Sequence, residues 1–327
     1  MKVKAKNSAG VMIGILVSVC VLVFFAGCNR RQKGEDGQIV VAAVLKTTVS
    51  PFWQTVVSGL KDGAAEHNVK LIGPLGPPTE DAVEEQINMI QSVISQKPDV
   101  LVLAPSQPPA TVKALRQVKA AGIKIILIDT PMPDNFEDYE TFIGTTNFTA
   151  GADAAKIIIQ SGIPQGSNTV ILEGAPGNPT MTQRADGAEK TFRDAGFNIA
   201  ARQPAYSDKE RAFTVMQNIM QTTPDIAAVF SANDDQALGA YRAISQAGKT
   251  AVVIGVDGTR DALNSILRGE LHGSMGQNSY QMGVLAVENA VKLMQGAAVD
   301  KRIDSGTTVL TKENAQKQIE FLDKIGG

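Results

Sequence analysis

Short apolar runs alternate with longer amphipathic stretches from residue 39 onward. The apolar runs predict strands at residues 39–45, 69–72, 100–103, 125–128, 169–172, 227–230 and 252–256. The intervening stretches predict helices that include residues 52–67, 81–96, 109–121, 147–161, 208–222 and 234–247. In the second of these helices Val83, Ile87 and Ile90 recur at spacings of four and three, as one buried helix face requires.

Strands that are apolar along their whole length and separated by helices are typical of parallel sheets covered on both faces. There are too many such units for one small sheet, and residues 141–151 are interpreted as a crossing between two. We therefore predict an α/β fold with two doubly wound parallel-sheet lobes. Such sheets bind ligands outside the carboxyl ends of their strands, so the residues that follow each strand are candidates for a site.

The residues that follow the predicted strands are polar and carry both signs of charge. They are Lys46, Asp129, Glu173, Asn233 and Asp257, and the aromatic pair Phe52 and Trp53 lies shortly after the first strand. Sugar hydroxyls need paired donors and acceptors, and the C–H faces of a pyranose need a flat apolar surface. These residue types favour a neutral polyhydroxylated ligand.

The N-terminus has the organisation of a bacterial export signal. A segment with Lys2, Lys4 and Lys6 precedes an apolar run at residues 11–25, which suits a secretory signal and is short for a hydrocarbon core of ~30 Å. The run leads into Cys28 through the sequence FAGC, which resembles a lipobox with phenylalanine in place of the usual leucine.

We predict a lipoprotein signal peptide at residues 1–27, lipidation of Cys28, and a polar tether at residues 28–37. A plain signal peptide or a short uncleaved anchor is the alternative. The tether sequence NRRQKGEDG is polar and charged, which is typical of a flexible linker.

Composition excludes several classes of protein. The chain has 327 residues, 43% of them hydrophobic, and a net charge of -2, which allows two ordinary cores and gives no electrostatic footprint for nucleic acid. Its two cysteines, Cys20 and Cys28, both lie in the N-terminal segment, so the rest of the chain offers no disulfide and no thiol nucleophile. With only two histidines we expect no metal site, and we expect no cofactor.

Catalytic motifs are also missing from the sequence. The loop after the first strand reads KTTVSPFW rather than G-x-G-x-x-G, and no G-x-S-x-G is present. His67 and His272 fall at a helix end and in a loop, which leaves a Ser-His-Asp triad without a base. We therefore predict that the protein is not an enzyme. A sugar-responsive repressor is excluded because an export signal stands where a helix-turn-helix is needed.

Four segments resemble the type I periplasmic sugar-binding proteins of ABC importers, especially those for D-allose and D-ribose. They read VLKTTVSPFW, EGAPGNPTMTQRADGAEKTF, SANDDQALGA and VIGVDGT, and they begin at residues 44, 173, 231 and 253. The resemblance implies two lobes joined by a three-crossing hinge, a monosaccharide in the cleft, and delivery to the permease. It places lobe 1 at residues 38–145 plus 278–305 and lobe 2 at residues 146–277 plus 306–327.

The resemblance also implies a set of ligand-binding residues. These are Lys46, Phe52, Trp53, Asp129, Asn147, Arg184, Asn233, Asp257 and Gln277. The two aromatic residues match the pair that packs on the sugar, the acids match hydroxyl acceptors, and the arginine matches a donor to sugar oxygens. Lys46 follows the allose-like pattern rather than the ribose-like one, so an allose-like hexose is expected ahead of ribose.

Three departures from the family pattern bear on the ligand. Ser50 stands where many relatives have asparagine, and Thr130 stands where ribose-like proteins have an arginine. The family's second-lobe aromatic residue aligns with Ser207, and Tyr206 precedes it. Either Tyr206 takes its place through a shifted loop, or one aromatic wall of the site is lost.

Each candidate also has a structural interpretation. Asn233 is suited to cap the helix that follows it, Asp257 to form a turn before a glycine, and Trp53 to fill a core. We nevertheless predict a monomeric, lipid-anchored, extracytoplasmic solute-binding protein that presents a monosaccharide to an ABC importer. The alternative is a receptor that presents a sugar or a furanose signal to a membrane sensor.

Overall fold

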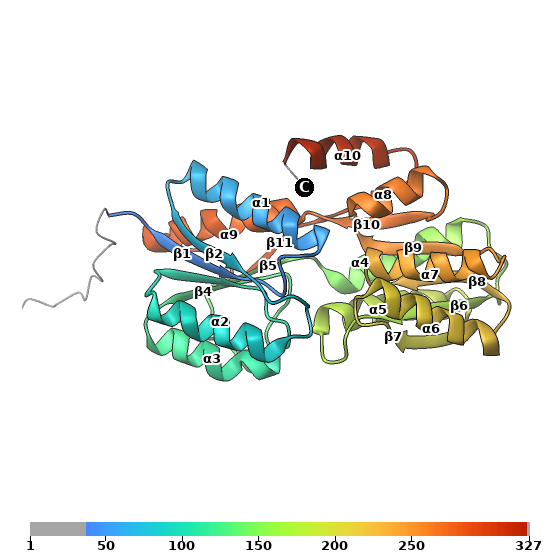
Figure 1. Ribbon diagram of the computed structural model, residues 1–327, viewed down its shortest axis with the longest axis horizontal. Coiled ribbons are helices and arrows are strands. Elements are labelled where there is room, and N and C mark those ends of the chain that lie inside the picture. Colours follow the sequence, from blue (N-terminus) through green and yellow to red (C-terminus); the bar gives the residue numbers. More distant parts are fainter. Residues whose placement is uncertain (1–36, 326–327) are drawn as a thin grey trace, which may run out of the picture.

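The computed structural model describes residues 37–325, which form two α/β lobes side by side (Figure 1). The first lobe has strands β1 (Val40–Val44), β2 (Lys70–Leu75), β3 (Val100–Leu103), β4 (Lys124–Ile128), β5 (Thr141–Gly144) and β11 (Arg302–Asp304). Its helices are α1 (Pro51–Glu66), α2 (Val83–Ser95), α3 (Pro108–Ala120) and α9 (Ser279–Met294).

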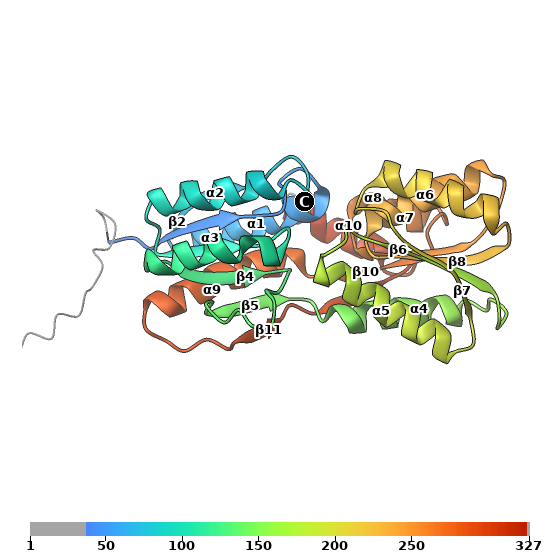
Figure 2. The same ribbon diagram turned by 90° about the horizontal axis from the view of Figure 1, so that it is seen from below.

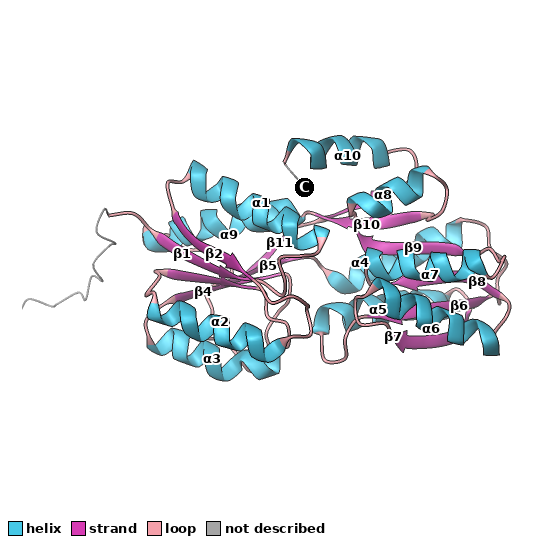
Figure 3. Cartoon of the chain, in the orientation of Figure 1, coloured by secondary structure: helices cyan, strands magenta, loops and turns pink. Residues whose placement is uncertain are grey.

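The second lobe has strands β6 (Asn168–Glu173), β7 (Asn198–Pro204), β8 (Ile226–Ser231), β9 (Val252–Asp257), β10 (Gly273–Gln277) and β12 (Thr307–Leu310). Its helices are α4 (Asn147–Gln160), α5 (Pro179–Asp194), α6 (Lys209–Thr222), α7 (Asp234–Gln246), α8 (Arg260–Leu267) and α10 (Ala315–Lys324). Figure 3 distinguishes the helices and strands of both lobes by colour.

Each lobe is built on one six-stranded sheet. The strand orders are β11-β5-β4-β3-β1-β2 and β12-β10-β9-β8-β6-β7. In each sheet the first strand along the chain, β1 or β6, has the second strand on one side and the third on the other, so the direction of winding changes at that strand. Every pairing is parallel except that of β12 with β10, which is antiparallel. The predicted α/β fold with two doubly wound lobes is confirmed, with this one antiparallel edge as a difference.

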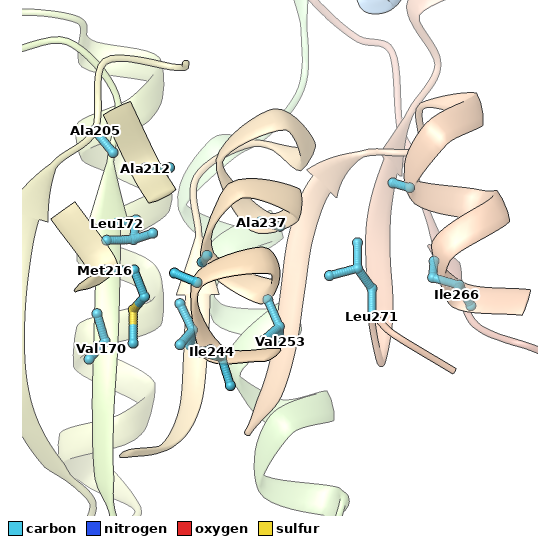
Figure 4. Close-up of a cluster of buried hydrophobic side chains, with 14 of the residues drawn as sticks. Val170, Leu172, Ala205, Ala212, Met216, Ala237, Ile244, Val253, Ile266 and Leu271 are labelled. Atoms are coloured by element: carbon cyan, nitrogen blue, oxygen red, sulfur yellow. The ribbon is translucent and has the colours of Figure 1, made fainter. Parts of the chain in front are cut away.

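Helices cover both faces of each sheet, as the continuous apolar strands require. In the first lobe, α1 and α9 bury one face and α2 and α3 the other (Figures 1 and 2). In the second lobe, α4 and α5 cover one face, and α6, α7, α8 and α10 contribute to the core on the other. Figure 4 shows part of that second core, where Val170, Leu172 and Val253 meet Met216 and Ile244 from the helices.

The chain passes between the two sheets three times, after β5, after β10 and after β11. The crossing expected at residues 141–151 is wrong in extent, because Thr141–Gly144 is strand β5 and α4 already begins at Asn147. All four residues of β5 are buried, but so short a run gave no clear strand signal in the sequence. Between residues 37 and 325, no helix is long and apolar enough to cross a membrane.

Candidate ligand-binding site

A cavity of about 360 Å³ lies between the lobes, lined by loops that follow strands of both sheets. Eight of the nine predicted ligand residues line it, namely Lys46, Phe52, Trp53, Asp129, Arg184, Asn233, Asp257 and Gln277. Its volume is at the lower end of the roughly 300–1,000 Å³ found for small-molecule sites. Positions spread over more than two hundred residues of sequence therefore converge on one small chamber.

Asn147, the ninth predicted residue, does not line the cavity. Its side chain instead forms a hydrogen bond with the cavity-lining Arg184. Its Oδ1 accepts a hydrogen bond from Arg184 Nε at 2.8 Å, and its Nδ2 donates to the carbonyl of Thr145 at 3.2 Å. Asn147 therefore fixes the direction in which the guanidinium points. The predicted lipidation site, Cys28, lies outside the residues that the structure describes.

Lys46 and Asp129 form a buried ion pair on the first-lobe side of the cavity. Lys46 Nζ donates to Asp129 Oδ2 at 2.7 Å, and the two side chains are only 1% and 4% exposed. Burial alone would raise the pKa of the Asp129 carboxyl, but the charges of Lys46 and Arg184 and the hydrogen bonds from Lys46 and Thr130 hold it below its ordinary value. Asp129 Oδ1 and the remaining ammonium protons are left to face a ligand.

The aromatic wall belongs to the first turn of α1. Pro51 occupies the first helical position, where the missing N–H costs no hydrogen bond, and Phe52 and Trp53 follow it. Their rings pack edge to face with centroids 5.0 Å apart. Trp53 Nε1 donates to Glu80 Oε1 at 2.7 Å, which fixes the orientation of the indole. The pair therefore offers a rigid apolar surface with its one polar group already satisfied.

Arg184 lies on α5, which packs against α4 at very short range. A Cβ on Gly151 would lie 1.9 Å from the carbonyl oxygen of Arg184, so only glycine permits this approach. Arg184 Nη1 donates to the carbonyl of Ala232 at 2.9 Å and to Asp257 Oδ1 at 3.3 Å. Its buried Nη2 has no hydrogen-bond partner among residues 37–325, which leaves a donor for a ligand acceptor.

Asp257 ends strand β9 in a backbone conformation that L-residues rarely adopt, with φ of 135°. Gln277 Nε2 donates to its Oδ1 at 2.6 Å. Burial raises the pKa of the Asp257 carboxyl well above its ordinary value, and this outweighs the attraction of Arg184 at 3.3 Å. The negative charges of Asp234 and Asp129 raise it further. Asp129 also has a positive φ, of 61°, so the two predicted acids of the cavity are both held in unusual backbone geometry, as is common at functional sites.

One hydroxyl connects all three passages of the chain between the lobes. Thr145, in the first passage, donates to Gln277 Oε1 at 2.8 Å, and its oxygen lies 3.4 Å from the hydroxyl of Ser305 in the third passage. Gln277 ends the strand before the second passage and holds Asp257 through its amide. The hinge and a cavity-lining acid are therefore in direct contact.

Asn233 takes both roles that its sequence position suggested. Its Oδ1 accepts from the backbone N–H of Gln236 at 3.0 Å, which caps α7, and the residue also lines the cavity. Glu173 differs from expectation, because it is the last residue of β6 rather than the residue after it, and it does not line the cavity. Its carboxylate pairs with Arg202, a residue of the neighbouring strand β7 that the sequence pattern did not reveal.

Several lining residues were not predicted. Residues 78–81, between β2 and α2, bring Glu80 and Asp81 to the cavity, and Arg211 and Asp235 line it from the second lobe. Burial raises the pKa of the Asp235 carboxyl to about 6, despite the nearby positive charge of Lys209. The sequence could have indicated residues 78–81, because they follow a predicted strand and ligands bind beyond the carboxyl ends of strands in such sheets.

Tyr206 places an aromatic side chain on the second-lobe side of the cavity. Tyr206 and Ser207 are consecutive left-handed residues, with φ of 59° and 58°, and both line the cavity. The Tyr206 ring is 42% exposed and carries the guanidinium of Arg211 at 4.8 Å from its centroid. An aromatic side chain of the second lobe therefore lies at the edge of the cavity, stacked with Arg211.

The fold and the cavity define a two-lobe binding protein of the periplasmic type. Residues 41–298 match the model of the periplasmic binding protein domain, and the chain belongs to that family. It is 29% identical over 298 residues to the ribose import binding protein of Bacillus subtilis, covering 91% of this chain and 95% of that one. It is 29% identical to the D-allose-binding periplasmic protein of Escherichia coli, covering 86% and 89%.

Solved structures give the same assignment. A solute-binding protein from Agrobacterium vitis with bound D-fucose is 31% identical, with a TM-score of 0.79, over 85% of this chain and 97% of that one. Another solute-binding protein, from Actinobacillus succinogenes with bound D-allose, is 27% identical with a TM-score of 0.80, and the match covers 86% of this chain and 100% of that one. These relatives are named as binding proteins, and membership of the family implies an exported protein.

Proposed function

We propose that this protein binds a monosaccharide between its lobes and delivers it to the permease of an ABC importer. The observation that carries the proposal is that eight of the nine ligand residues expected from the sequence and its resemblance to known families line one cavity. It offers charged donors, carboxylate acceptors and an aromatic pair within about 360 Å³, which suits the hydroxyls and C–H face of one sugar ring. The sugar-binding relatives support the same conclusion.

The proposed mechanism is closure of the lobes, stabilised by the ligand. Lys46 and Asp129 contribute from the first lobe, and Arg184 and Asp257 from the second. A ligand that touches both sets favours the closed form by its differential affinity for that form. The link between Gln277 and Asp257 makes the hinge part of the site, so we infer that ligand contact and hinge geometry are coupled.

The ligand is expected to be a neutral pyranose hexose of the allose type, ahead of ribose. Lys46 and Trp53 motivate this order, since both follow the allose-like pattern and both line the cavity. Isothermal titration against a panel of aldoses, ketoses, polyols, amino acids and sugar acids tests the proposal. Ribose, or an anionic or amino-acid ligand, binding at least as tightly as every hexose would contradict it.

We further propose that Cys28 is the lipidated N-terminal residue of the mature protein and holds it at the extracytoplasmic face of a membrane. The sequence FAGC after a fifteen-residue apolar run supports this. Cys28→Ser is expected to yield a soluble or unprocessed protein, measured by fractionation and by mass spectrometry of the N-terminus. Cys20→Ser is the matched control and is expected to behave as wild type. Acylation of the Cys28→Ser protein at the wild-type level would refute the assignment.

A further inference from the structure

Two buried hydroxyls from opposite lobes meet beside the ligand cavity. Thr130 directly follows Asp129 in the first lobe, and Thr180 lies in the first turn of α5 in the second. Both side chains are fully buried, and their hydroxyl oxygens are 3.1 Å apart. The Thr180 hydroxyl also lies 3.3 Å from the carbonyl oxygen of Asp129, to which it can donate. These contacts join the lobes without any ligand atom.

The direction of this hydrogen bond follows from the chemistry of its neighbours. Thr130 Oγ1 donates its single proton to Asp129 Oδ2 at 2.7 Å, because an ionised carboxylate only accepts. The Thr130 oxygen is therefore an acceptor toward the second lobe. Thr180 is the donor, and its one proton is shared between the Thr130 oxygen and the carbonyl of Asp129. The low pKa of Asp129 keeps this carboxylate ionised, so the direction is constant at ordinary pH.

A second ligand-free contact joins the lobes at the edge of the cavity. Arg211 Nη1 on α6 lies 3.6 Å from Asp81 Oδ2 in the segment before α2. Their side chains are 53% and 45% exposed, so this ion pair is weak and screened by salt. Gln107 Nε2 also donates to the carbonyl of Pro176 across the cleft, but at a long 3.5 Å and at an exposed position. Of these polar contacts beside the cavity, the threonine pair is fully buried and is therefore screened least by solvent.

We propose that Thr180 is a closure residue of this protein, whose hydroxyl holds the lobes together through Thr130 and Asp129 and so controls how fast a bound sugar is released. The inference rests on the proposed sugar-binding function. Opening the lobes breaks this hydrogen bond, whereas a sugar entering the open form does not meet it. Its loss therefore accelerates dissociation and leaves association unchanged.

The experiment uses stopped-flow fluorescence of the mature protein with D-allose as the probe. Trp53 is the single tryptophan of the chain and lines the cavity, so its emission reports on the site. Thr180→Val keeps the shape and removes the hydroxyl, and a neutral buried hydrogen bond corresponds to about a 2- to 10-fold change in an equilibrium constant. We expect the dissociation rate to rise by about that factor at an unchanged association rate.

Two further variants separate the hydroxyl from general effects. Thr180→Ser restores the donor and is expected to recover most of the slow dissociation. Thr182→Val makes the same substitution two residues along α5 at an exposed position, and is expected to match wild type. A dissociation rate for Thr180→Val equal to that of Thr182→Val, or a change confined to the association rate, overturns the proposal.

Failure of D-allose to bind the wild type contradicts the favoured sugar, and a panel without any sugar that binds contradicts the proposed function. In either case small-angle scattering of the ligand-free proteins decides the role of Thr180. A larger radius of gyration for Thr180→Val than for wild type and Thr182→Val supports a closure bond. Equal radii for the three proteins overturn it.

Discussion

Replacing Asp257 with alanine is expected to weaken sugar binding by at least about a hundredfold. Arg184 and Gln277 both donate to its Oδ1, which leaves the two lone pairs of Oδ2 to accept from ligand hydroxyls. A hydrogen bond to a charged group contributes roughly 1.5–3 kcal/mol, and the loss of two corresponds to ~3–6 kcal/mol. Asp257→Asn keeps the shape but turns one acceptor into a donor, so it is also expected to bind poorly.

The ligand-free protein is expected to tolerate either change. The pKa of the Asp257 carboxyl is higher in the folded state than in the unfolded state. Its protonation therefore adds to the free energy of unfolding at low pH, and this contribution is lost as the pH rises through the folded pKa. Burial disfavours ionisation of Asp257, so its ionisation adds no stability that a neutral side chain would remove. Arg184 keeps its hydrogen bonds to Asn147 and to the carbonyl of Ala232, and the nearby charge of Asp129. Titration calorimetry and apo melting temperatures measure the two effects, with the exposed Asp300→Ala as control. Near-wild-type affinity in Asp257→Ala, or an apo melting point lowered by many degrees, would identify a structural turn residue instead.

The strands that the sequence revealed are mostly those buried on both faces. β3, β4, β8 and β9 lie inside their sheets and are nearly continuous apolar runs. The strands missed at the edges have no such run, because an edge strand is covered less completely. β7 reads NIAARQP, β11 has three residues, and three of the four residues of β12 are exposed.

Two interior strands were also missed, β5 because it has only four residues and β10 for a different reason. β10 reads GSMGQ and has weak strand propensity, yet all five residues are buried. A Cβ on Gly276 would lie 2.5 Å from Leu310 Cδ1, so the glycine makes room for the antiparallel strand β12. Local propensity is overridden here by packing with a segment more than thirty residues away.

The rule that ligands bind at strand ends brought several candidate residues to the cavity, whereas the others were expected only from the resemblance to known sugar-binding proteins. Strand ends determine where a residue lies in the fold. They do not determine where its side chain points. Asn147 lies in the predicted crossing and Glu173 follows a predicted strand, but the side chain of Asn147 turns to Arg184 and that of Glu173 to Arg202. Those partners come from helix–helix and strand–strand packing, which one sequence does not contain.

Replacing Lys46 with methionine is expected to destabilise the ligand-free protein and to abolish sugar binding. Removing one member of a buried ion pair leaves the other charge uncompensated and typically costs about 3–5 kcal/mol. Asp129 would remain fully buried, with the more distant charge of Arg184 and a hydrogen bond from Thr130 as its support. Lys61→Met, at an exposed position of α1, is the matched control and is expected to melt as wild type.

The pH dependence gives this prediction a distinct signature. In the wild type the pKa of Asp129 is lowered, so its stabilising contribution is present above about pH 4 and is lost as the pH falls through the folded value. Without Lys46, burial raises that pKa, and the variant is expected to regain stability as acidification protonates Asp129. The difference in melting temperature between wild type and variant should therefore narrow from pH 8 to pH 5.

A second substitution separates stability from binding. Lys46→Met combined with Asp129→Asn removes both charges, so the folded state no longer holds an unpaired carboxylate and neutral-pH stability is expected to return close to that of wild type. Sugar binding is expected to stay lost, because the paired donor and acceptor facing the cavity are gone. If Lys46→Met melts like Lys61→Met at every pH, the two groups are solvated rather than paired. If the double variant binds sugar normally, the pair serves the first-lobe core and the ligand contacts lie elsewhere in the cavity.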